Sequence, residues 1–145
     1  MSDMKSFLER LQRDKNTKAD RQEELKQWVS DLGTLMRSIE EYLSEGSAQK
    51  LLTVRKISES VSEPLVGSYD APLLIIKMPA GLTVNVAPKG RYIEGTEGMV
   101  DLTGITGRTV SLIRDTSGAW KFKESGLALD KDSLGQVLDK LTSTF

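Results

Sequence analysis

The sequence predicts an α+β protein in which a helical N-terminal arm precedes a small antiparallel β-domain. Residues 1–45 contain no proline and one glycine, Gly33, which favours helix. Residues 51–123 are rich in Val, Ile, Thr and Gly, with short apolar–polar alternations and turn signals that are typical of strands. Residues 132–143 return to apolar residues at helical spacing, which predicts a C-terminal helix packed on the sheet.

These observations divide the chain into two parts. We expect residues 1–46 to form a helical, coiled-coil-like association arm and residues 47–145 to form the β-domain with its helix. A chain of 145 residues suits one domain with an appendage.

The arm opens with an apolar face and continues through a polar stretch. Residues 12–24 contain Ala19 as their one apolar residue, with Asn16 and Thr17 in the middle. One interpretation places a break at Asn16–Thr17, which gives an αα-hairpin, and the other is one helix about 60 Å long. We prefer the break, although Glu9–Arg13 and Asp14–Lys18 at i, i+4 would support continuity. The opening face consists of Met4, Phe7, Leu8 and Leu11.

An apolar stripe with alternating gaps of three and four residues occupies the rest of the arm. Such spacing is typical of a coiled-coil seam, but Val29, Met36 and Leu43 widen it to the face of a bundle or globular helix. The stripe can pack on the chain's own β-domain or on another molecule. We expect intermolecular packing, most simply a homodimer and otherwise another protein. The predicted partner-binding residues are Leu25, Trp28, Leu32, Leu35, Ile39 and Tyr42.

The middle of the chain predicts seven short strands in an antiparallel meander or small barrel. PAG at 79–81, PKG at 88–90 and Asp115–Gly118 supply the turns between several of them. Later glycine pairs at 95/98 and 104/107 indicate tight turns or bulges. The expected strands are Leu51–Ile57, Leu73–Met78, Leu82–Val86, Arg91–Glu94, Met99–Leu102, Thr109–Arg114 and Ala119–Lys123.

Composition argues against several functional classes. The chain has no Cys and no His, which excludes thiol nucleophiles, Ser-His-Asp triads and the usual zinc sites. The formal net charge of −1 gives no global attraction for nucleic acid or an acidic membrane. We therefore expect a non-enzymatic, cytoplasmic protein with no metal, no cofactor and no membrane segment, acting as an adaptor, inhibitor or subunit. Asp130 or Asp132 is explained as a helix N-cap rather than as a calcium ligand.

One motif favours a different function. KGRYIEG at 89–95 is loosely similar to the basic and aromatic strands on which small barrels stack single-stranded nucleic acid. The alternative prediction is therefore nucleic-acid binding through Lys89, Arg91 and Tyr92. A solvated edge strand explains the same residues, and we prefer that explanation.

Overall fold

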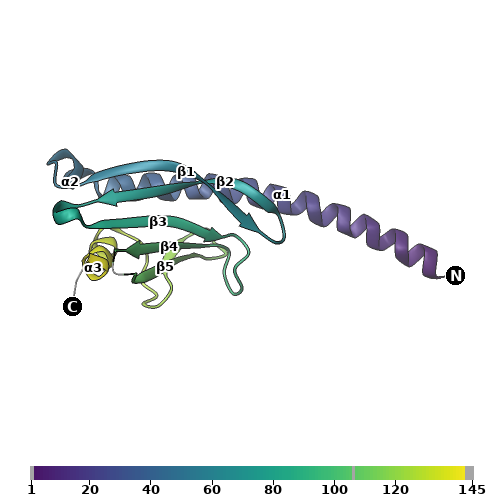
Figure 1. Ribbon diagram of the computed structural model, residues 1–145. Coiled ribbons are helices and arrows are strands. Elements are labelled where there is room, and N and C mark those ends of the chain that lie inside the picture. Colours follow the sequence, from purple (N-terminus) through teal and green to yellow (C-terminus); the bar gives the residue numbers. More distant parts are fainter. Residues whose placement is uncertain (1, 106, 143–145) are drawn as a thin grey trace.

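The computed structural model describes residues 2–105 and 107–142, with the backbone alone at residues 2–3 and 10–20. A long helix is followed by a sheet and a C-terminal helix, so the α+β prediction is confirmed (Figure 1). The helices are α1 (Ser2–Tyr42), α2 (Ser44–Ala48) and α3 (Lys131–Thr142), with a short 3-10 turn at Pro79–Gly81. The strands are β1 (Thr53–Glu63), β2 (Gly67–Lys77), β3 (Thr83–Gly90), β4 (Met99–Gly104), β5 (Thr109–Arg114) and β6 (Trp120–Phe122).

Helix α1 runs without interruption through the polar stretch 12–24, so the preferred αα-hairpin is wrong. Asn16 and Thr17 have only modestly lower helix propensity than alanine, and no proline or glycine accompanies them. Residues 2–20 extend beyond the sheet, and we call them the projecting half (Figure 1). Residues 21–42 lie along the sheet and form the anchored half. The Leu11 side chain lies outside the described residues.

The six strands follow one another in space in the order of the sequence, which makes an open antiparallel meander. The predicted barrel is wrong, because β1 and β6 remain at opposite edges of the sheet. The strands β1 and β2 pair over all eleven residues of each, whereas β2 pairs with β3 only at Leu74–Lys77. The expected strand Arg91–Glu94 is a loop instead.

The β1–β2 hairpin twists enough to change which of its faces is covered. Along β2 the buried positions are Ala71 and Leu73, then Leu74 and Ile76, so burial moves from odd to even residues. In β1, Val54 is half-buried near one end and Val61 near the other, with the same change of parity. The right-handed twist of a long two-stranded ribbon accounts for the change. The outer half of the hairpin therefore crosses over α1 (Figure 1).

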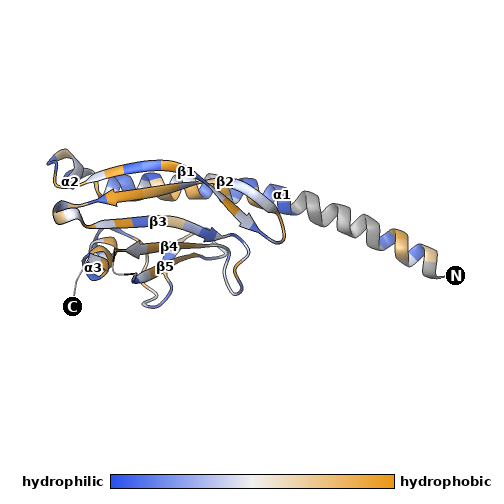
Figure 2. Ribbon diagram, viewed as in Figure 1, coloured by the Kyte–Doolittle hydropathy of each residue, from blue (hydrophilic) through white to orange (hydrophobic). Residues whose placement is uncertain are grey.

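One apolar core joins both helices to one face of the sheet. The anchored half of α1 contributes side chains at gaps of three and four residues, as its stripe predicts. Figure 2 shows a run of apolar residues along β2, the strand that this helix contacts. By packing, residues 21–42 belong to the same body as the sheet rather than to a separate arm. The buried α1 residues are Trp28, Leu32, Leu35, Met36, Ile39 and Leu43, just beyond its end.

Helix α3 completes the core where it packs against β3, β4 and β5. Its N-cap is Asp130, whose carboxylate accepts from the Ser133 N–H at 2.8 Å while the Ser133 hydroxyl accepts from the Asp130 N–H at 2.9 Å. The N-cap prediction for Asp130 is confirmed. Leu134 and Leu141 are buried. A Cβ at Gly104 would lie 2.3 Å from the Leu141 carbonyl oxygen, so glycine permits the close approach of α3 to β4.

Candidate interaction surface

The apolar stripe that was predicted to bind a partner lies against the chain's own sheet. The sheet offers an apolar face along the anchored half of α1, so intramolecular packing takes the place of the predicted coiled-coil seam. Side chains buried in this way present no surface to a second molecule while the chain is folded. Of the six predicted partner-binding residues, four lie in the core, namely Trp28, Leu32, Leu35 and Ile39. The other two, Leu25 and Tyr42, are half-buried at its margin.

A buried carboxylate fastens the outer end of the β1–β2 hairpin to the body. Glu63 is 7% exposed and accepts hydrogen bonds from the backbone N–H groups of Arg91 and Tyr92 at 3.1 and 3.0 Å. Its Oε2 also accepts from the Tyr69 hydroxyl at 2.5 Å, and that hydroxyl accepts from Trp28 Nε1 at 3.1 Å. The N–H groups at 91 and 92 are thus used by a side chain, which explains why this segment leaves the strand ladder.

The residues of the alternative prediction meet carboxylates in this junction. Arg91 Nη2 lies 2.9 Å from Glu97 Oε2 and 3.8 Å from Glu24 Oε2. The Tyr92 hydroxyl donates to Glu24 Oε2 at 2.9 Å. Lys89 is exposed on β3, but the Arg91 side chain is only 13% exposed. Two of the three residues are therefore occupied by acidic partners, and binding of nucleic acid through them stays a prediction.

Arg114 makes a second link between α1 and the sheet. It is 6% exposed, its Nη1 bonds the Asp31 carboxylate, and its Nε donates to the Glu97 backbone oxygen at 3.0 Å. The guanidinium carbon lies 5.0 Å from the centre of the Trp28 ring, within the range of a cation–π contact. The same ring packs on Gly98, which has φ +134° and whose Cβ would come 2.2 Å from it. Only glycine fits there.

Two tyrosines in the junction are held in the neutral form. Burial raises the pKa of Tyr69 well above its ordinary value of 10.0, and its hydrogen bond to Glu63 raises it further. Burial and the hydrogen bond to Glu24 raise the pKa of Tyr92 to about 12. Both phenols therefore stay protonated near neutral pH, where they donate hydrogen bonds and do not act as bases.

The hydrogen bonds and ion pairs of this junction hold α1, the hairpin and the loop at 91–98 together. Its carboxylates are bound to arginine, tyrosine or backbone donors. Within the described part of the chain, no three His, Cys, Asp or Glu side chains gather in a way that could hold a metal ion. The cluster ties α1 to the hairpin, to the loop at 91–98 and to β5.

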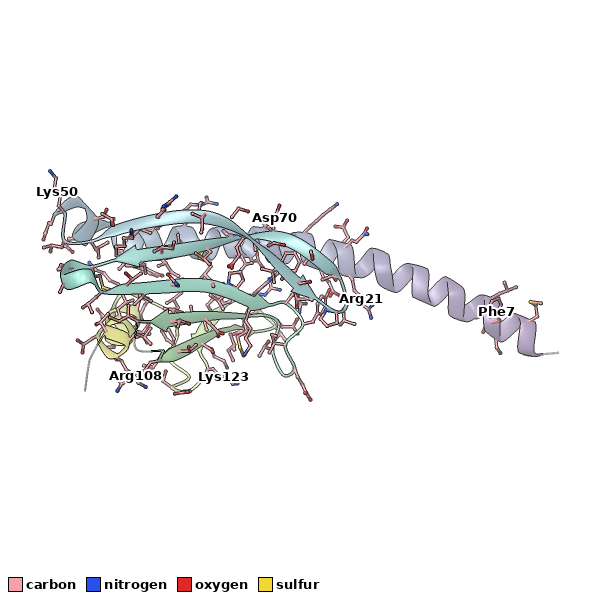
Figure 3. All side chains as sticks on the ribbon, in the orientation of Figure 1. Phe7, Arg21, Lys50, Asp70, Arg108 and Lys123 are labelled. Carbon is pink, nitrogen blue, oxygen red and sulfur yellow. The ribbon has the colours of Figure 1, made fainter. Side chains whose placement is uncertain are left out.

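The projecting half of α1 carries large apolar side chains in contact with solvent. Met4, Phe7 and Leu8 are 66%, 46% and 55% exposed. Their i, i+3, i+4 spacing places them on one face of the helix. Figure 3 shows Phe7 near the far end of this helix and Arg21 where the helix reaches the body. These residues belong to the predicted opening face of the arm and were not among the predicted partner-binding residues.

The surface area of the chain reflects this extension. The exposed area is 9168 Å², whereas a compact monomer of 16.0 kDa exposes about 7,400 Å². The difference of about 1,800 Å² is comparable to the total area buried in a standard protein–protein interface, about 1,600 Å².

A second apolar surface lies on the anchored half, beside the hairpin. A shallow depression of about 420 Å³ is lined by residues of α1 and by Tyr69 of β2. A neighbouring depression of about 240 Å³ is lined on one side by the hairpin turn, where Leu65 is 51% exposed. The α1 residues that line the first are Gln22, Leu25, Lys26 and Val29.

Sequence reasoning missed most of the junction. Glu63, Tyr69 and Arg114 come from three strands, and no spacing within the chain connects them. Trp28, Arg91 and Tyr92 were predicted as site residues for other reasons. Gly98, in a glycine pair, predicted a turn but not the tryptophan ring above it.

Comparison with protein-family models, with curated proteins and with solved structures gave no match. In the described residues, every helix is too short or too polar to pass through a bilayer.

Proposed function

We propose that this chain is a non-catalytic protein–protein interaction protein, an adaptor, inhibitor or subunit, and that the projecting half of α1 is its contact element. The observation that carries the proposal is the exposure of Met4, Phe7 and Leu8 on one face of a helix that extends beyond the body. The N-terminal helix is still the proposed contact element, but the proposed site is this exposed face and not the buried stripe.

The anchoring of α1 supports this proposal. The links from Trp28 to Tyr69 and from Asp31 to Arg114 fix the helix on the sheet within about three turns of the point where it leaves the body. A helix held in this way presents its exposed face in one orientation, which lowers the entropy lost on binding.

The size of the apolar face constrains the partner. Covering the exposed parts of three such side chains contributes roughly 3 kcal/mol, which corresponds to binding weaker than millimolar. A partner that binds tightly must therefore cover more of α1 than these three residues.

A variant in the projecting half tests the proposal. Leu8→Asp should abolish association, measured as the mass of the native particle by sedimentation and as capture of a partner from the source cell. Ser6→Asp is the matched control, because it adds the same charge two residues away, on a different face of the helix. The proposal is overturned if the unaltered chain is monomeric at high micromolar concentration and every protein that it captures is also captured by the Leu8→Asp variant.

Binding of single-stranded nucleic acid is the weaker candidate. The carboxylates of Glu24 and Glu97 compete with phosphate for Arg91 and would repel a nucleic-acid backbone. A gel shift at low salt tests it: affinity that falls steeply with added salt would favour this function over the first. A cytoplasmic location fits either function and is likewise a prediction.

A further inference from the structure

The two apolar surfaces of α1 lie on the same line along the helix. Met4 and Gln22, Phe7 and Leu25, and Leu8 and Lys26 are each separated by 18 residues. Since 18 residues make five turns of 3.6, each pair shares one direction around a straight helix and is about 27 Å apart along the axis. The exposed apolar face of the projecting half and the depression on the anchored half therefore lie on the same side of α1.

We infer that the partner is a second copy of this chain, docked antiparallel along α1, with Met4, Phe7 and Leu8 of each copy in the Leu25–Val29–Tyr69 depression of the other. This inference rests on the proposed function and names the partner for the same surface.

Two-fold symmetry brings both surfaces into contact at once. An axis near residues 16 and 17, midway along the shared stretch, places Met4 of one copy opposite Val29 of its partner and Leu8 opposite Leu25. Each contact then occurs twice, as an isologous interface requires. The paired contacts supply the further apolar burial that three side chains alone lack.

The available area is sufficient for a stable dimer. A standard interface takes about 800 Å² from each partner. The chain exposes about 1,800 Å² more than a compact monomer of its mass, so one such interface uses less than half of the excess.

The test measures both the dissociation constant and the direction of the helices in the full chain. The sequence has no cysteine, so Ser6→Cys, outside the contact face, gives one site for a spin label. In the antiparallel dimer the two labelled positions lie about 30 Å apart, because 21 helical residues separate positions 6 and 27. In a parallel dimer they would lie within about 10 Å, the distance between packed helices.

Two variants test the surfaces separately. Leu8→Asp alters the projecting face, and Leu65→Asp alters the exposed hairpin turn beside the depression. Each change acts twice in a symmetric dimer, so we expect the dissociation constant to rise by roughly tenfold or more, with Ser6→Asp unchanged. An equimolar mixture of the two variants should regain part of the association, because the mixed dimer keeps one intact contact.

The outcomes separate this inference from the proposed function. A long label distance that both variants abolish supports the antiparallel dimer. A short distance overturns the antiparallel docking but leaves association through α1 in place. A monomer that still captures another protein through Leu8 overturns the second copy as partner, again leaving the proposed function. A monomer that captures nothing overturns both.

Discussion

The two halves of α1 belong to one helix but meet opposite surroundings. In the anchored half, Trp28 and Leu32 have no solvent exposure, whereas in the projecting half Met4 and Leu8 are more than half exposed. Both halves show apolar residues at gaps of three and four. Helical amphipathicity therefore predicts which face of a helix is buried in a contact, but not which segment or molecule makes that contact.

The largest effect should follow a charge placed in the anchored half. Leu32→Asp puts a carboxylate into a core position without a partner, and we expect a loss of more than about 4 kcal/mol in the free energy of unfolding. Urea denaturation followed by circular dichroism measures it. Leu8→Asp, the same change in the projecting half, should stay within about 0.5 kcal/mol for the monomer. A loss for Leu32→Asp as small as the loss for Leu8→Asp would show that the stripe is not part of the core.

The contact of α1 with the loop at 91–98 gives the next largest effect. Gly98→Ala should cost about 3 kcal/mol or more, since the new Cβ meets the Trp28 ring at 2.2 Å and the positive φ strains alanine. Gly95→Ala is the control, because Gly95 also has a positive φ but has nothing within 4 Å of its Cβ position. Chemical denaturation should show a much smaller loss there, and equal losses would contradict the packing of Trp28 on Gly98.

Removal of the hydroxyl between α1 and the hairpin should have an intermediate effect. Tyr69→Phe takes one donor from buried Glu63 and the acceptor from Trp28 Nε1, which should cost about 1–3 kcal/mol. Amide hydrogen exchange would show faster opening of the outer half of β1 and β2, with the inner half near Leu74 unchanged. Uniform acceleration across the sheet would refute the role of Glu63 as a local fastening.

Deprotonation of Tyr92 at alkaline pH should have the smallest effect. The pKa of Tyr92 rises from 10.0 to about 12 in the folded chain, so its contribution to stability is complete below pH 10. Between about pH 10 and 12 the unfolded chain loses this proton first, and the free energy of unfolding falls, by about 1 kcal/mol for a group near the surface. Tyr92→Phe should reduce the slope of this part of the profile, and the raised pKa of Tyr69 accounts for the slope that remains. An unchanged slope would show that the hydroxyl is not bound to Glu24.

The elements with strong local signals could be predicted from the sequence. The Asp130 cap, the Asp115–Gly118 turn and the alternation in Thr83–Val86 are each specified by neighbouring residues. The segment Arg91–Glu94 was predicted as a strand because its composition suits one. It forms a loop because Glu63, 28 residues earlier, takes its N–H groups.

Residue identity and short-range spacing are enough to predict that α1 is amphipathic and that the middle of the chain forms strands, and they exclude chemistry that needs Cys or His. Which part of α1 is covered depends on the folded chain: the stripe from Trp28 to Ile39 lies under the chain's own sheet, and Met4 and Leu8 do not. The sheet extends along only half of α1. Burial therefore depends on which segments, distant in the sequence, pack against a residue and not on the residue alone.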